Sequence, residues 1–152
     1  SRRQRQMCIR DRLYSLVMNA QGRNLFSAGK PLELLAYEAQ IASVKDVAEK
    51  GPCVIVGRAA DCILRGSYDV VSIFVSASLP DRIAHVSRRD GIPEEEAAKK
   101  IARLDKARAS FYNSFSNQKW GEADSYDLCI HLGRVREAAA VELILQYLRS
   151  LA

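Results

Sequence analysis

The sequence is poor in the residues that most often build metal sites and disulfide frameworks. Its 152 residues include two histidines and four cysteines, and the cysteines show no C-x-x-C spacing. We therefore expect no structural metal site. Cysteines that occur singly, some of them in apolar runs, are typical of buried free thiols in a reducing cytosol. We expect this state for Cys8, Cys53, Cys62 and Cys129.

Long hydrophobic runs are also absent. The longest runs are far too short to span a bilayer, and no signal-peptide pattern precedes them. At 48% hydrophobic and 27% charged residues, the chain has the composition of a globular protein with room for one core. The sequence therefore predicts a cytoplasmic protein that has no membrane partner.

The positive charge of the chain is concentrated at one end. The first 12 residues (SRRQRQMCIRDR) hold five of the 23 Lys and Arg residues and one of the 18 Asp and Glu residues. The other 140 residues carry 18 basic and 17 acidic side chains and are nearly neutral. A neutral body offers no second contact surface for nucleic acid, so we expect no such partner. We interpret residues 1–12 as a non-native or disordered basic tail, and residues 13–152 as a single domain.

The sequence also lacks a P-loop, the glycine-rich loop that cradles nucleotide phosphates. A P-loop has four residues between its glycines and a Ser or Thr after its Lys. Here six residues separate Gly22 from Gly29, and Pro31 follows Lys30. The resemblance of this stretch to a P-loop is therefore superficial.

A short apolar run is the most informative stretch that the sequence does contain. Gly51 and Pro52 precede the run Cys53–Val56, and Gly57 and Arg58 follow it. Such a run predicts a strand that is buried on both faces. Arg58 would then stand at the carboxyl end of the strand, where open α/β sheets bind their ligands. Its guanidinium would bind a phosphate there or form a surface salt bridge, and the stretch fits both.

Strands alternate with helices along the rest of the chain, which predicts a parallel α/β sheet. Two further strands are expected at residues 68–75, as a buried strand, and at residues 126–132. Helices are expected over residues 32–50, 59–64, 81–89 and 134–151, with another that begins at Pro93. In the last helix, the residues expected to face inward are Ala138, Val141, Ile144, Leu145 and Leu148.

A basic face is expected on the helix over residues 81–89. Arg82, His85 and Arg89 share this face at spacings of three and four residues, and the helix begins just after a strand. Two arginines and a histidine in this position would address a phosphate. The alternative is a basic face that contacts only solvent.

One charged residue interrupts the apolar face of the helix that begins at Pro93. The spacing of Ile101, Leu104 and Phe111 would put residue 108 on the apolar stripe, and residue 108 is Arg. A charge on an inward stripe is costly unless it is paired or faces a ligand. Asp105, one turn earlier, is the obvious partner. We favour the ligand-facing interpretation of Arg108, because nearby basic residues add further positive charge.

Taken together, these stretches resemble the cytidylate kinase-like family of P-loop nucleoside monophosphate kinases. The segments that carry the resemblance span residues 51–132, and the flanking helices from about Leu13 onward also fit. Only the combination of segments is specific. The resemblance rests on GPCVIVGRAADCIL, VVSIFVSASLPDRIAHVSRRDGI, IARLDKARASFY followed by QKWG, and YDLCIHL.

The resemblance implies a fold and a set of site residues. The fold would be a three-layer αβα parallel sheet of the P-loop nucleoside monophosphate kinase type, with its first (P-loop) strand missing and a helical lid at about residues 90–120. Arg58 would contact the phosphate of the acceptor nucleotide. Asp105 and Arg108 match the Asp-x-x-Arg of the lid, and Arg82 and Arg89 are weaker matches. On this basis Arg108 and Arg89 are expected to be catalytic, and Arg58, Arg82, Asp105 and Arg108 to bind substrate.

The same resemblance implies phosphoryl transfer from ATP, with Mg²⁺, to CMP or dCMP in the full-length family member. The donor site is missing from this chain, so we expect the chain itself to be an inactive, amino-terminally truncated fragment. The alternative is a non-catalytic module that keeps a nucleotide-binding pocket. Either way the expected partner is a small-molecule nucleotide, and the sequence predicts no particular oligomeric state.

Overall fold

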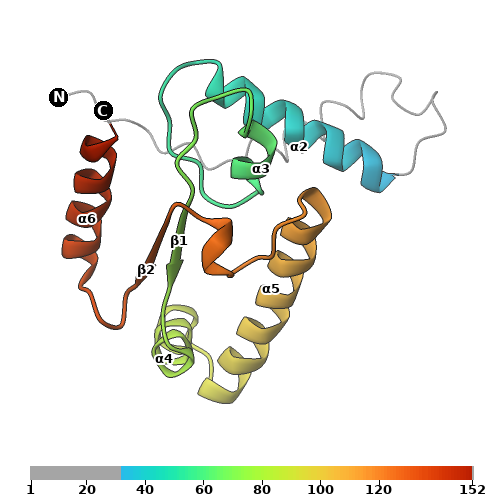
Figure 1. Ribbon diagram of the computed structural model, residues 1–152. Coiled ribbons are helices and arrows are strands. Elements are labelled where there is room, and N and C mark those ends of the chain that lie inside the picture. The colour runs from blue at the N-terminus through green and yellow to red at the C-terminus, as the bar shows by residue number, and fades with distance from the viewer. Residues whose placement is uncertain (1–31, 152) are drawn as a thin grey trace. The chain divides into compact units, whose positions relative to one another are not determined.

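The structure is a computed structural model that describes residues 32–151, except for the side chains of residues 32–34 and 115. Figure 1 shows the helices and strands along the chain. The chain divides into two compact units, residues 1–70 and 71–152, and each is described here by itself. The basic tail, Cys8 and the P-loop-like stretch at residues 22–31 lie outside the described residues. The prediction that residues 13–152 form one domain stays a prediction.

The described part of the first unit, residues 32–70, contains two helices, α2 (Leu32–Ala48) and α3 (Ala60–Leu64), close to their predicted bounds. Its core is small and centres on Val44, which is completely buried. Ala60 and Leu64 of α3 pack with Val44, and the partly buried hydrophobic residues around them are Ala48, Ile55, Ile63, Tyr68 and Val70. The core therefore joins α2 and α3 and fixes the segment between them.

The prediction of a buried strand at Cys53–Val56 is wrong for this structure. The segment belongs to no strand or helix, and Val54 and Val56 are 94% and 85% exposed. A strand needs a neighbouring strand to pair its backbone N–H and C=O groups, and residues 32–70 contain no strand. The expectation of buried thiols fails for the same reason at Cys53, which is exposed; the described cysteines are free, as predicted.

The second unit contains a parallel pair of strands, β1 (Ile73–Ser76) and β2 (Leu128–His131). Ile73 lies opposite Leu128, and the register continues to Ser76 opposite His131. The Asp127 carboxylate fixes this register, because its Oδ2 accepts hydrogen bonds from the Ser72 amide at 2.7 Å and the Ser72 hydroxyl at 2.8 Å. Both strands are shorter than predicted. Val75 and Cys129 are exposed where buried side chains were expected, because a strand side chain is buried only where another element covers that face of the sheet.

Two helices connect the strands, as a parallel pair requires. The first is α4 (Leu79–Asp90), in which the Ser78 hydroxyl caps the amino terminus by accepting from the Asp81 amide at 3.3 Å. Gly91 ends α4 with a φ of 66°, a left-handed conformation that suits glycine. The second is α5 (Glu94–Phe115), which takes up most of the predicted lid range and precedes a short 3₁₀ helix, η2 (Ala123–Ser125). The range of the predicted lid is therefore largely helical, and its role as a lid stays a prediction.

The last helix, α6 (Glu137–Ser150), turns a different face inward from the one predicted. Ala140 is buried and Ile144 is partly buried. The other four residues predicted to face inward are exposed: Ala138, Val141, Leu145 and Leu148. Apolar residues cover most of the circumference of α6, so periodicity alone did not identify the face that packs on the unit.

The described residues form a mixed α/β structure that is mostly helical and has a small parallel sheet. This agrees with the α/β class expected from the sequence. No helix between residues 32 and 151 is both long and apolar enough to cross a membrane.

Candidate functional site

The first candidate site is the turn that carries Arg58, in the unit of residues 1–70. Gly57, Arg58 and Ala59 have φ values of 71°, 64° and 49°, so three successive residues adopt the left-handed conformation. Glycine adopts it readily, but it strains Arg58 and Ala59. The buried Gln40 of α2 stabilises the turn by donating from Nε2 to the Arg58 carbonyl oxygen at 3.2 Å. Local sequence favours the turn only at Gly57, so packing against α2 holds the rest.

The second candidate site lies between α4 and α5 in the unit of residues 71–152. Arg82 Nη2 donates to Asp105 Oδ2 at 2.6 Å, and Arg108 Nη1 donates to Asp105 Oδ1 at 3.0 Å. One carboxylate therefore holds two guanidinium groups, and the cluster has a net charge of +1. The Arg108 side chain is 55% exposed and that of Asp105 only 23%. The structure thus brings together three of the five predicted site residues.

Arg89, the fourth predicted residue of this unit's site region, belongs to a separate ion pair. Its Nε and Nη2 donate to Oδ1 and Oδ2 of Asp90 at 2.7 and 3.1 Å, and Lys100 Nζ donates to Asp90 Oδ2 at 2.9 Å. The hydrogen bonds from Arg89, then Lys100, hold the pKa of Asp90 well below its usual range. The hydrogen bonds that Arg89 donates to Asp90 in turn raise the pKa of Arg89.

The two ion-pair clusters lie toward opposite ends of α4. Arg82 of α4 pairs with Asp105 of α5, and Asp90 of α4 pairs with Lys100 of α5. Arg82 and Arg89 are seven residues apart on one helix, which is about 10 Å along its axis. The structure therefore does not bring Arg89 to Arg82, Asp105 and Arg108. Arg58 belongs to the other unit.

The expected basic face of α4 is partly realised. His85 is exposed, as the solvated interpretation of this face predicts. Arg82, by contrast, turns to α5 and is held by Asp105. The ion-paired interpretation of Arg108 is also correct as far as Asp105 is concerned, although more than half of its side chain remains open to solvent.

Sequence reasoning missed a polar group at the carboxyl ends of the two strands. An added Cβ on Gly133 would lie 3.0 Å from Asp81 Oδ2 and 3.0 Å from His131 Cε1, so all three residues are close neighbours. Ser78 donates to the same Asp81 oxygen at 2.5 Å. In the sequence, each of these residues either ends a strand or follows one within a few positions. This placement is the feature of the sequence from which the group could have been predicted. This is the edge at which α/β sheets bind ligands.

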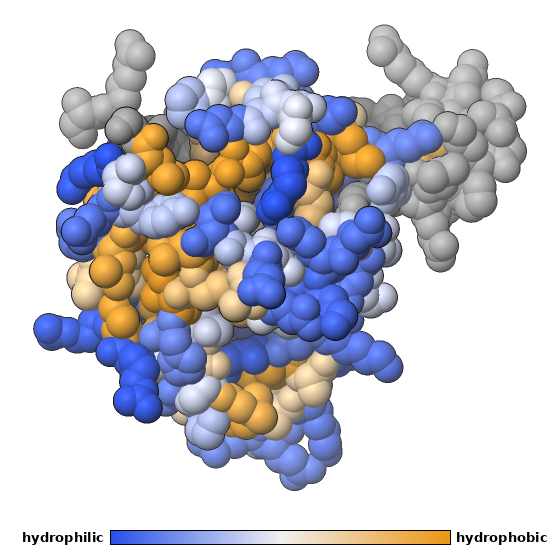
Figure 2. Space-filling view, viewed as in Figure 1, coloured by the Kyte–Doolittle hydropathy of each residue, from blue (hydrophilic) through white to orange (hydrophobic). Residues whose placement is uncertain are grey.

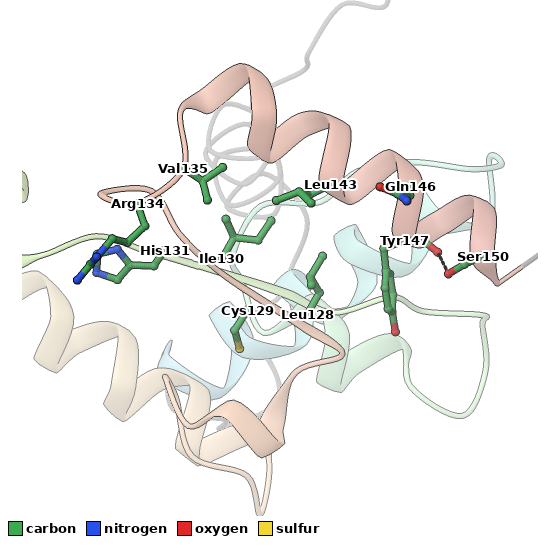
Figure 3. A pocket seen from close by; sticks show the side chains of 10 residues that line it. All are labelled: Leu128, Cys129, Ile130, His131, Arg134, Val135, Leu143, Gln146, Tyr147 and Ser150. Atoms are coloured by element: carbon green, nitrogen blue, oxygen red, sulfur yellow. Dashed lines mark hydrogen bonds between the residues drawn. The ribbon is translucent and has the colours of Figure 1, made fainter.

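A shallow groove of about 450 Å³ separates β2 from α6 and is shown in Figure 3. Its walls are mainly apolar and come from Leu128 and Ile130 of β2 and Leu143 of α6. His131 and Arg134 lie at one end of it. None of the five predicted site residues lines this groove.

The described residues do not fit a magnesium ion. Within residues 32–151, no group of three or more His, Cys, Asp or Glu side chains is placed to hold a metal. Asp90 and Asp105 each accept from two basic side chains, which occupy their oxygens. We therefore assign no Mg²⁺ ligand in this part of the chain.

Comparisons with known proteins identify the family. A model of the cytidylate kinase-like family matches residues 1–134. No curated protein matches the chain. A solved structure that is similar is an uncharacterized protein from Eubacterium ventriosum ATCC 27560, with 31% sequence identity and a TM-score of 0.71. The alignment covers 76% of this chain and 65% of that one, so this chain spans less than two thirds of that protein's length. Because the family match extends over most of its residues, the chain belongs to the cytidylate kinase-like family.

Proposed function

We propose that this chain contains the acceptor side of a nucleoside monophosphate kinase that transfers a phosphoryl group from ATP to CMP or dCMP. Family membership supports a nucleotide kinase-like function. The observation that carries the proposal is the cluster of Arg82, Asp105 and Arg108, in which two guanidinium groups share one carboxylate.

The chemistry of the cluster suits phosphoryl transfer. This reaction depends mainly on positioning and on neutralising charge on the phosphate oxygens, and arginine needs no activation for either. Asp105 uses one hydrogen bond on each guanidinium, so both arginines keep further N–H donors for a phosphate. In this proposal Arg108, the more exposed arginine, contacts the transferred group, and Arg82 and Asp105 bind substrate and orient it.

Arg58 takes the phosphate of the acceptor nucleotide in the proposal. Strain at a non-glycine residue often accompanies a functional role, and the φ of 64° at Arg58 is such a case. Arg89 is the weaker catalytic candidate, because Asp90 already occupies the Nε–Nη2 edge of its guanidinium.

The donor half of the reaction lies outside what this sequence provides. The chain contains no glycine-rich loop with P-loop spacing. We therefore propose that ATP and Mg²⁺ are bound by a three-layer P-loop fold larger than this chain, and that this chain alone has negligible turnover. A non-catalytic nucleotide-binding module would share the acceptor site. A coupled ADP-release assay on this chain that gave ordinary kinase turnover would contradict the proposed inactivity.

The acceptor site is tested by isothermal titration of the chain with CMP and with cytidine. Because the arginines recognise phosphate, CMP should bind at least about tenfold more tightly than cytidine. Arg58→Ala and Arg108→Ala should each weaken CMP binding by about tenfold or more. Arg103→Ala is the matched control, since Arg103 lies on α5, is exposed and forms no ion pair with a described residue. Equal binding of CMP and cytidine, or equal effects of the Arg103 and Arg108 variants, would overturn the proposal.

A further inference from the structure

An apolar stripe on α6 lies beside the buried face of the helix and is exposed. Val141, Leu145 and Leu148 are 54%, 38% and 41% exposed and follow one another at spacings of four and three residues. This spacing puts them on one line along the helix, as in the seam of a coiled coil. The groove toward β2 is lined by other α6 residues, including Leu143 and Tyr147. Figure 2 shows hydrophobic atoms at the surface on the side that α6 occupies in Figure 1.

Two opposite charges border this stripe on the same side. Glu142 and Arg149 are exposed and seven residues apart, so they lie two turns from each other on one flank. They are too far apart to pair within the helix, about 10 Å along its axis. Neither forms a salt bridge with a described residue, unlike the acidic and basic side chains that join α4 to α5.

The stripe and its charges complement themselves under a two-fold rotation. If two copies of α6 pack antiparallel with the axis beside Leu145, Val141 of one copy comes within one residue of Leu148 of the partner subunit, since the two lie four and three residues from the axis. Glu142 likewise comes within one residue of Arg149 of the partner subunit, and this offset of about 1.5 Å is one that long charged side chains span. In an antiparallel pair of helices, residues on one flank of the apolar stripe face residues on the same flank of the partner helix. A parallel arrangement would instead bring Glu137 near Glu142 of the partner subunit, two like charges.

We propose that this stripe is the contact surface for a second copy of the chain, packed through antiparallel α6 helices. The apolar seam supplies the attraction, and the two Glu142–Arg149 pairs set the orientation. A helix of 14 residues is about 21 Å long, so the contact is smaller than the roughly 1,200 Å² at the low end of stable interfaces. We therefore expect a reversible dimer with an affinity in the range of about 10–100 µM.

Sedimentation equilibrium of the full chain at about 5 to 500 µM tests this surface, because the range brackets the expected affinity. The mass should rise from monomer toward dimer. Glu142→Arg and Arg149→Glu should each weaken the dimer about three- to tenfold, since each substitution opposes like charges twice. The double exchange, Glu142→Arg with Arg149→Glu, should restore it. Leu145→Lys should abolish the dimer, whereas Leu143→Lys, on the groove side of the same helix, should leave it unchanged.

Several outcomes would overturn the proposal. A monomer at every concentration would do so, and so would a dimer that ignores all three stripe and flank substitutions, because the contact would then lie elsewhere. Single charge reversals that weaken the dimer without rescue by the double exchange would exclude the antiparallel pairing. Far-ultraviolet circular dichroism identifies any variant that fails to fold. If Leu145→Lys fails to fold, the substitutions of the exposed Glu142 and Arg149 still decide the test.

Discussion

Arg82 Nη2 and Asp105 Oδ2 lie 2.6 Å apart and join α4 to α5 across 23 residues of sequence. The same carboxylate also holds Arg108, so its loss would leave two guanidinium groups without this partner. Asp105 is therefore expected to act in two ways. It stabilises the helix pair, and it fixes the positions of the two arginines proposed to bind phosphate.

The Asp105→Asn variant tests the first of these roles. Asparagine keeps the shape but removes the negative charge, so the free energy of unfolding should fall by about 1 kcal/mol. Urea unfolding followed by the fluorescence of Trp120 measures this, because the only tryptophan packs edge-on against Phe74 in the same unit at 5.5 Å. Glu95→Gln is the control, since it breaks a fully solvent-facing pair with Lys99 and should cost less than about 0.3 kcal/mol. Equal losses in the two variants would contradict a special role for Asp105.

Arg58→Gly should separate stability from nucleotide binding. Glycine relieves the left-handed strain at this position, so the variant should be more stable by about 0.5–1 kcal/mol. Without the guanidinium, CMP affinity should fall about tenfold or more. Thermal unfolding and isothermal titration of the same samples give the two numbers.

Ala59→Gly is the matched backbone control for Arg58. It relieves similar strain at φ 49°, but it also removes a buried methyl group, so the stability gain should stay below about 0.5 kcal/mol. CMP affinity should not change. If both glycine variants bind CMP as well as the unaltered chain, Arg58 does not hold the phosphate.

Acid should weaken the α4–α5 pair through Asp90. The pKa of Asp90 is lowered from 3.8 in the folded chain, so its ion pairs contribute stability above that pH. This contribution is lost as the pH falls below the ordinary pKa toward the lowered one. Asp90→Asn should therefore be less stable than the unaltered chain at pH 7 and should lose less stability between about pH 5 and pH 2. Urea midpoints measured at each pH check this; parallel curves would show that Asp90 makes no such contribution.

Removing the cap of α4 should destabilise the second unit. Ser78→Ala takes away the hydroxyl that accepts from the Asp81 amide, which should cost about 1 kcal/mol. Ser78→Thr keeps a hydroxyl that can accept from the Asp81 amide and donate to the Asp81 carboxylate, so it should recover most of the loss. Chemical unfolding of the unaltered chain and the two variants measures the free energy of unfolding of each. An alanine variant as stable as the unaltered chain would show that the cap contributes nothing to stability.

Local patterns determined most helices and the nature of the site residues. Pro80 and Pro93, the acidic first turn of α5 and Gly91 mark helix ends that the structure keeps within two residues or so. The pairing of Asp105 with Arg108 was also predictable, because three residues bring them to one side of a helix. The alternation of helices and strands was enough for the α/β class, and the motifs were enough for the family.

Tertiary structure decided which of these residues meet. Sequence spacing placed Arg82 and Arg89 on one face of α4. In the folded chain they belong to different ion-pair clusters. Arg82 pairs with Asp105 of α5, whereas Arg89 pairs with Asp90, which also pairs with Lys100 of α5. Likewise, the apolar residues of Cys53–Val56 predicted a strand, yet a strand forms only where a neighbouring strand hydrogen-bonds to its backbone. Residue types and local helices depend on near neighbours in the chain. Burial and ion pairing depend on partners far away in it, and only the folded chain supplies those.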